Sequence, residues 1–198
     1  IDLIHDNIPL LNLSDDISTA VTFFDDYKLR QIPVFEASKF LGLIDEKVVL
    51  NASSKSKIKD LKKHLIKEEV SSEKNLFDVL HFFSHGNLSI LPVVDKDNNY
   101  LGSIHERILL QKICDILKVE NTGGIIHLQT KIIDYSLAQI AQIVEGNGAI
   151  ILSSLCITNS SNSKLMDILI KINQEELSGI IQTFQRYDYK ILASFHKN

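Results

Sequence analysis

Apolar positions in the first half of the chain recur at helical spacing in two places. Each set follows the spacing i, i+3, i+4, i+7, which puts four apolar side chains on one helix face. The sets are Ile17, Ala20, Val21 and Phe24, and Leu76, Val79, Leu80 and Phe83. They predict two helices, whose expected N-caps are Ser14 or Asp15 and Ser71 or Ser72.

The two helices belong to a duplicated module. A shift of 59 residues carries Leu29 onto Leu88 and Pro33 onto Pro92, and beyond the next turn a shift of 60 carries Gly42 onto Gly102. In each copy the helix is followed by two short β-runs joined by a polar turn. The predicted runs are 31–35 and 40–44, then 89–94 and 100–104. Each copy reads as βαββα and is small for an independent core, so we expect the copies to pack sheet to sheet around a shared one.

The pattern changes after Gly123. Strand-like runs and amphipathic helix faces follow one another in the order βαββαβ, which is the ferredoxin-like layout of an antiparallel sheet covered by helices. The stretch 120–124 breaks the helical pattern and contains two glycines, which is typical of a domain boundary. The predicted fold class is α+β, with a first repeat at 1–58, a second repeat at 59–120 and a third domain at 123–198.

Two segments of the repeat, LRQIPVFEASKFLGLI and LSILPVVDKDNNYLGSI, resemble the CBS domain, which occurs as a tandem pair called a Bateman module. This resemblance covers residues 6–118. The later βαββαβ pattern, with DYSLAQIAQIVE after its first strand, resembles the ACT domain, a small regulatory module. The order of modules is similar to that of the acetoin-utilisation accessory protein and its uncharacterised bacterial relatives.

The CBS resemblance implies clefts for adenosyl compounds between the copies. In the family, a hydroxyl after the glycine strand contacts phosphate, and a carboxylate three residues later holds the ribose. Here Asp45 and Val48 take these positions in the first copy, and His105 and Ile108 in the second. A missing carboxylate forgoes about 1.5–3 kcal/mol, and Asp45 would repel a phosphate by about 1–4 kcal/mol. We therefore expect an adenosyl nucleotide, the one cofactor that the resemblance implies, to bind weakly or not at all. Any binding is expected in the second cleft, beside His105 and Arg107. The candidate cleft residues are Ile8, Pro9, Ile32, Pro33, Val34, Asp45, Val48, Leu91, Pro92, Val93, His105, Arg107 and Ile108.

The ACT resemblance implies an amino-acid ligand at the turn after the first strand, where many members carry a glycine. The corresponding turn, 133–137, has none. Asp134 is expected to cap the following helix. The alternative is that Asp134, Tyr135 and Ser136 contact a ligand.

Composition excludes several function classes. The net charge of −4 argues against a nucleic-acid partner, and the lysine-rich stretch 51–69 reads as the solvated side of a helix between the repeats. No apolar run is long enough for a membrane span. Cys114 and Cys156 lie in apolar segments, which predicts buried free thiols and a cytoplasmic protein. His81 and His85 are spaced for a metal but lack a third ligand.

No nucleophile motif or phosphate loop is present, so the sequence predicts neither catalytic residues nor an enzyme. We expect a regulatory homodimer that senses a small-molecule effector and acts on a partner protein that the sequence does not identify. Two alternatives stay open. The chain is a structural or interaction module with empty clefts, or it senses an adenine nucleotide through the second cleft.

Overall fold

The computed structural model describes residues 3–4, 7–159 and 161–196. The chain divides into two compact units, Ile1–Lys112 and Ile113–Asn198. Among the described residues, no helix combines the length and the apolar character needed to cross a membrane.

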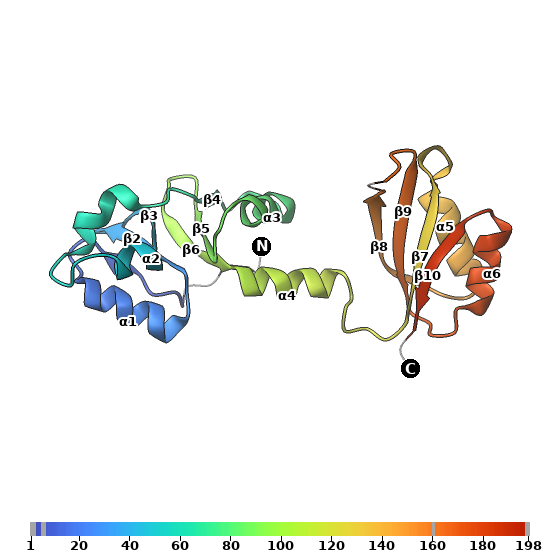
Figure 1. Ribbon diagram of the computed structural model, residues 1–198, viewed down its shortest axis with the longest axis horizontal. Coiled ribbons are helices and arrows are strands. Elements are labelled where there is room, and N and C mark those ends of the chain that lie inside the picture. The colour runs from blue at the N-terminus through green and yellow to red at the C-terminus, as the bar shows by residue number, and fades with distance from the viewer. Residues whose placement is uncertain (1–2, 5–6, 160, 197–198) are drawn as a thin grey trace. The chain divides into compact units, whose positions relative to one another are not determined.

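The N-terminal unit contains the two predicted βαββα copies (Figure 1). In each, a short strand pairs in parallel with the middle strand, which pairs antiparallel with the third. The elements of the first copy are β1 (Leu11–Asn12), α1 (Ile17–Tyr27), β2 (Gln31–Glu36), β3 (Lys39–Asp45) and α2 (Glu46–Leu50). Those of the second are β4 (Val70–Ser71), α3 (Leu76–His85), β5 (Ile90–Val94), β6 (Tyr100–His105) and α4 (Glu106–Ile116).

One apolar cluster contains side chains from both copies, which confirms the expected shared core. Ile32 and Ile44 of the first copy and Ile90 and Leu91 of the second are fully buried in it. Tyr100 of the second copy also packs against two rings of the first hairpin, with ring centroids 5.1 Å from Phe35 and 6.0 Å from Phe40. The two sheets are therefore held together by apolar contacts rather than by strand pairing.

The segment between the copies contains the predicted helix, which is a 3₁₀-helix, η1 (Ile58–His64). Beyond it, Ile66 exchanges two backbone hydrogen bonds with Leu43 of β3, at 2.8 and 2.9 Å. This close approach requires a glycine at position 42 of β3, because a Cβ on Gly42 would lie 2.7 Å from the Ile66 carbonyl oxygen.

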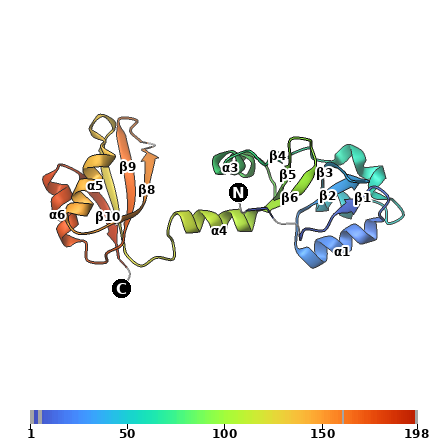
Figure 2. The same cartoon turned by 180° about the vertical axis from the view of Figure 1, so that it is seen from behind.

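The C-terminal unit has the predicted βαββαβ order, which confirms the α+β fold class. Its sheet is antiparallel throughout, in the strand order β10-β7-β9-β8. The two helices cover one face of this sheet, as both views show (Figures 1 and 2). The elements are β7 (Gly124–Lys131), η2 (Ile132–Asp134), α5 (Leu137–Gly146), β8 (Ile151–Thr158), β9 (Leu165–Ile172), α6 (Ser178–Arg186) and β10 (Lys190–Phe195).

Several expected helix caps were wrong. Asp16 precedes α1 in the N-cap position, and Asn75 caps α3 by accepting hydrogen bonds from two backbone N–H groups. In the C-terminal unit Ser136, and not Asp134, caps α5. The Asn75 and Ser136 side chains lie next to the first helical residue, where they reach free N–H groups of the first turn, whereas the Asp16 side chain makes no such bond.

The predicted burial of the two cysteines was also wrong, although the prediction of free thiols holds. Cys156 is exposed and Cys114 is partly buried, and both are free thiols. Cys156 lies in the second half of β8, an edge strand whose last four residues are exposed.

Candidate functional site

A pocket of about 280 Å³ lies at the N-terminus of α4. It is walled by residues from the start of the chain, from the end of α1 and from the junction of β6 and α4. They are Asn7, Ile8, Tyr27, Leu29, His105, Arg107 and Ile108. Four of these, Ile8, His105, Arg107 and Ile108, are among the candidate cleft residues that the sequence predicted. Asn7, Tyr27 and Leu29 were missed.

The turn into α4 sets the chemistry of this pocket. His105 ends β6, and its Nδ1 accepts a hydrogen bond from the backbone N–H of Arg107 at 3.0 Å. The neutral ring therefore carries its hydrogen on Nε2, the donor nitrogen. Arg107 lies in the first turn of α4, and a helix N-terminus carries partial positive charge. The polar end of the pocket thus includes the Arg107 guanidinium at the start of α4.

The acidic residue of the same turn is paired with the other copy. The Glu106 carboxylate accepts a hydrogen bond from Arg30 at 2.8 Å. The same guanidinium also donates to the Asn87 side chain at 2.9 Å and to the Leu88 carbonyl at 3.3 Å. Arg30 therefore joins the residue before β2 to α4 and pairs with the acidic residue of the α4 turn.

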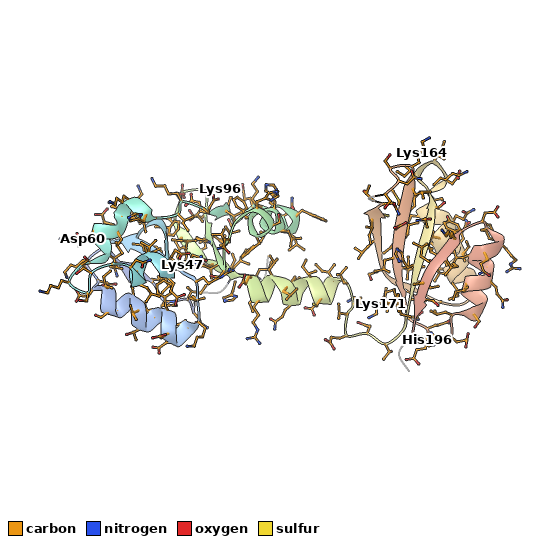
Figure 3. All side chains as sticks on the ribbon, viewed as in Figure 1. Lys47, Asp60, Lys96, Lys164, Lys171 and His196 are labelled. Carbon is orange, nitrogen blue, oxygen red and sulfur yellow. The ribbon has the colours of Figure 1, made fainter. Side chains whose placement is uncertain are left out.

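The equivalent turn of the first copy is built differently. Asp45 caps α2, and one of its carboxylate oxygens accepts the backbone N–H of Lys47 at 2.9 Å. Its other oxygen accepts a hydrogen bond from Gln31 at 2.9 Å. Val48 packs against the core, and Lys47, labelled in Figure 3, is exposed. A carboxylate thus occupies the place where the second copy has His105, so the two turns differ in charge.

The other predicted cleft residues lie in or beside the sheets. Ile32, Pro33 and Val34 are buried in β2, and Leu91, Pro92 and Val93 are buried in β5. Pro9 is half-buried in the segment before β1. Strands β2 and β5 pair with β3 and β6, which end at Asp45 and His105, the first residues of the two turns.

A buried polar network lies between the copies, and sequence reasoning missed it. The Gln31 side-chain oxygen accepts hydrogen bonds from the backbone N–H and the hydroxyl of Ser89, both at 2.8 Å. Its nitrogen donates to Asp45 and to the Asn87 carbonyl. Gln31 is 1% exposed and Ser89 3%. A polar residue in a β-run is the one signal that could have found it.

In the candidate turn of the C-terminal unit, the Tyr135 and Ser136 side chains form hydrogen bonds with other residues of the same unit. Asp134 is exposed at the end of η2, and the Ser136 hydroxyl accepts the Gln139 backbone N–H at 3.2 Å. Tyr135 lies 3.2 Å from the Cys156 thiol, and this hydrogen bond, with burial, raises the pKa of Tyr135 to about 12. The phenol therefore stays protonated at neutral pH.

The sheet face opposite α5 and α6 carries a strap, residues 117–119. The Ser153 hydroxyl donates to the Leu117 carbonyl at 3.1 Å, and the Lys171 ammonium, labelled in Figure 3, donates to the Val119 carbonyl at 2.9 Å. A pocket of about 220 Å³ lies between strap and sheet, walled mainly by apolar side chains. Nothing in the sequence pattern indicated that this segment docks on the sheet.

Solved structures with a similar fold are CBS-domain pairs. A CBS domain pair/ACT domain protein of Thermotoga maritima is 18% identical, with a TM-score of 0.53 over 59% of this chain and 96% of that one. CBSX2, in complex with AMP, is 17% identical, with a TM-score of 0.50 over 58% and 95%. The CBS pair of a putative Mg²⁺ transporter from Shewanella oneidensis is 17% identical, with a TM-score of 0.50 over 57% and 67%. These similarities show that the part of the chain that they cover has the fold of a CBS-domain pair.

A family model described as poxvirus serine/threonine protein kinase matches residues 19–145, and so places the chain in that family by sequence. No curated protein matches the chain. The matched range, however, begins after β1, includes the other strands of the two three-stranded sheets and continues into the second unit. The sequence also contains neither the glycine-rich loop nor the H-R-D and D-F-G motifs of protein kinases.

Proposed function

Because the N-terminal unit has the fold of a CBS-domain pair, we propose that this chain is a non-catalytic regulatory module whose effector binds in the pocket at the start of α4. One observation carries the proposal. Ile8, Tyr27 and His105 come from three separate segments and converge on one pocket that combines apolar walls with an arginine. Pockets of this make-up are typical of small-molecule sites. A bound effector stabilises the form of the protein that binds it.

A pocket-filling variant tests the proposal. Ile108→Trp should block the pocket, whereas Leu110→Trp, on an exposed position of the same helix, should leave it open. The measurement is the shift in melting temperature against a library of metabolites. We expect at least one compound to stabilise the wild type and Leu110→Trp but not Ile108→Trp. If no compound does so, the alternative of an interaction module with empty clefts is favoured.

AMP, ADP, ATP and S-adenosylmethionine are expected to bind weakly. Ile108 and Val48 take the two positions where the family resemblance implies a carboxylate for the ribose. We predict dissociation constants above about 10 µM, which corresponds to roughly −7 kcal/mol, in calorimetry. If a nucleotide does bind, Arg107→Ala should weaken its affinity more than Lys47→Ala does. A tighter constant for any of the four would support the adenine-nucleotide sensor instead.

We also propose that the C-terminal unit is an ACT-like domain and that the chain forms a homodimer. The βαββαβ order supports the first point. Exposed apolar side chains on the helices of the second copy support the second, since Phe77 of α3 is 81% and Ile116 of α4 46% exposed. Light scattering at micromolar concentration should give twice the chain mass of 22.4 kDa. A stable monomer would contradict the proposed dimer but would not contradict the proposed effector pocket.

A further inference from the structure

We propose that the effector is a compact carboxylate with an apolar body, and not a nucleotide. This inference rests on the proposed function and assigns the chemical class of ligand to the pocket at the start of α4. Three features of the pocket carry it: the make-up of its walls, its size, and the charge at its polar end.

The walls favour an apolar ligand body. Four of the seven lining residues, Ile8, Tyr27, Leu29 and Ile108, present aliphatic or aromatic groups. No lining residue among those described is acidic. At the position where the family resemblance implies a carboxylate for the ribose, a ribose diol would therefore meet the Ile108 side chain.

The size favours a compact ligand. Pockets for drug-sized molecules hold about 300–1,000 Å³, and this one measures about 280 Å³. A base, a sugar and a phosphate together need more room than a branched or aromatic acid.

The polar end favours a single negative charge. Arg107 is the one arginine or lysine among the described lining residues, and its planar guanidinium matches a carboxylate. Glu106 would oppose an anion, but its carboxylate is paired with Arg30 at 2.8 Å. One arginine balances one carboxylate, whereas a nucleoside phosphate brings more charge.

Phenylacetate and 3-methylbutanoate are suitable probes, with phenylacetamide as the neutral isostere and AMP as the nucleotide. Binding to the full chain is followed by calorimetry and by NMR shifts of residues 8, 27 and 107. We expect both carboxylates to bind saturably, with the amide at least tenfold weaker. Arg107→Gln should weaken the carboxylates at least tenfold. Lys47→Gln, at the equivalent position of the first copy, should change their affinity less than twofold.

The outcomes separate this inference from the proposed function. If the amide binds as well as the acid, or AMP binds more tightly, the ligand class is wrong while the pocket remains an effector site. If neither carboxylate binds but a library compound stabilises the wild type and not Ile108→Trp, the same conclusion follows. If nothing binds in either experiment, both the inference and the proposed function are overturned.

Discussion

Replacing Gly123 by alanine is expected to destabilise the C-terminal unit by about 3 kcal/mol or more. Gly123 has φ 136°, a conformation that L-residues rarely adopt, and a Cβ placed there would lie 1.9 Å from the Ile172 carbonyl oxygen. No side-chain movement relieves this clash, because the obstructing atom belongs to the backbone. The neighbouring Gly124 pairs with Ile172 in the central strands β7 and β9, so the start of this pairing must shift.

Gly146→Ala is the matched control for this substitution. Gly146 ends α5, and a Cβ added there meets nothing within 4 Å. Alanine in a helix is favoured over glycine by about 0.5–1 kcal/mol, so this variant should be slightly more stable than the wild type. Urea denaturation of the two variants measures the difference. Equal stabilities would show that the sheet tolerates the shift at Gly123.

The same experiment tests whether the chain is modular. Each unit has its own apolar cluster, and we propose that the two units fold independently. Gly123→Ala should therefore lower the unfolding transition of the C-terminal unit and leave that of the N-terminal unit in place. If both transitions fall together, the N-terminal unit depends on its neighbour and the proposed division is wrong.

The strands of both units could be predicted from the sequence because their signal is local. Alternating or continuous apolar runs placed β2 at 31–35, against Gln31–Glu36 in the structure, and β6 at 100–104, against Tyr100–His105. The caps could not be predicted in the same way. Ser14, Asp15 and Asp16 are chemically similar neighbours, and only the backbone geometry at the first helical turn selects among them.

The candidate pocket was predictable only where the repeat pointed to it. In the second copy, His105, Arg107 and Ile108 follow the strand that contains Gly102, so their distance from this glycine along the sequence identified them. Tyr27 and Leu29 come from the end of a helix in the other copy, and their place in the wall depends on how the two sheets pack. Pairs that are distant in sequence, such as Arg30 and Glu106, leave no local pattern.

The buried network around Gln31 leads to the second large prediction: Gln31→Met should destabilise the N-terminal unit by about 3 kcal/mol. Methionine fills a similar volume but cannot accept the two hydrogen bonds from Ser89 or donate to Asp45. Each buried polar group left without a partner costs about 1–3 kcal/mol. The measurement is the free energy of unfolding of the full chain from urea denaturation, taken from the transition of this unit.

Ser89→Ala is the graded control, because the backbone N–H of residue 89 still donates to Gln31. It removes the hydroxyl that donates to Gln31 and accepts the Arg30 N–H, and should cost about 1 kcal/mol. The second copy has an apolar residue at the equivalent position, because a shift of 59 residues places Ile90 where the first copy has Gln31. If Gln31→Met is as stable as the wild type, apolar packing alone holds the copies together. If it is destabilised more than Ser89→Ala, the network also sets how the two copies meet, and with it the position of the α4 turn beside the pocket.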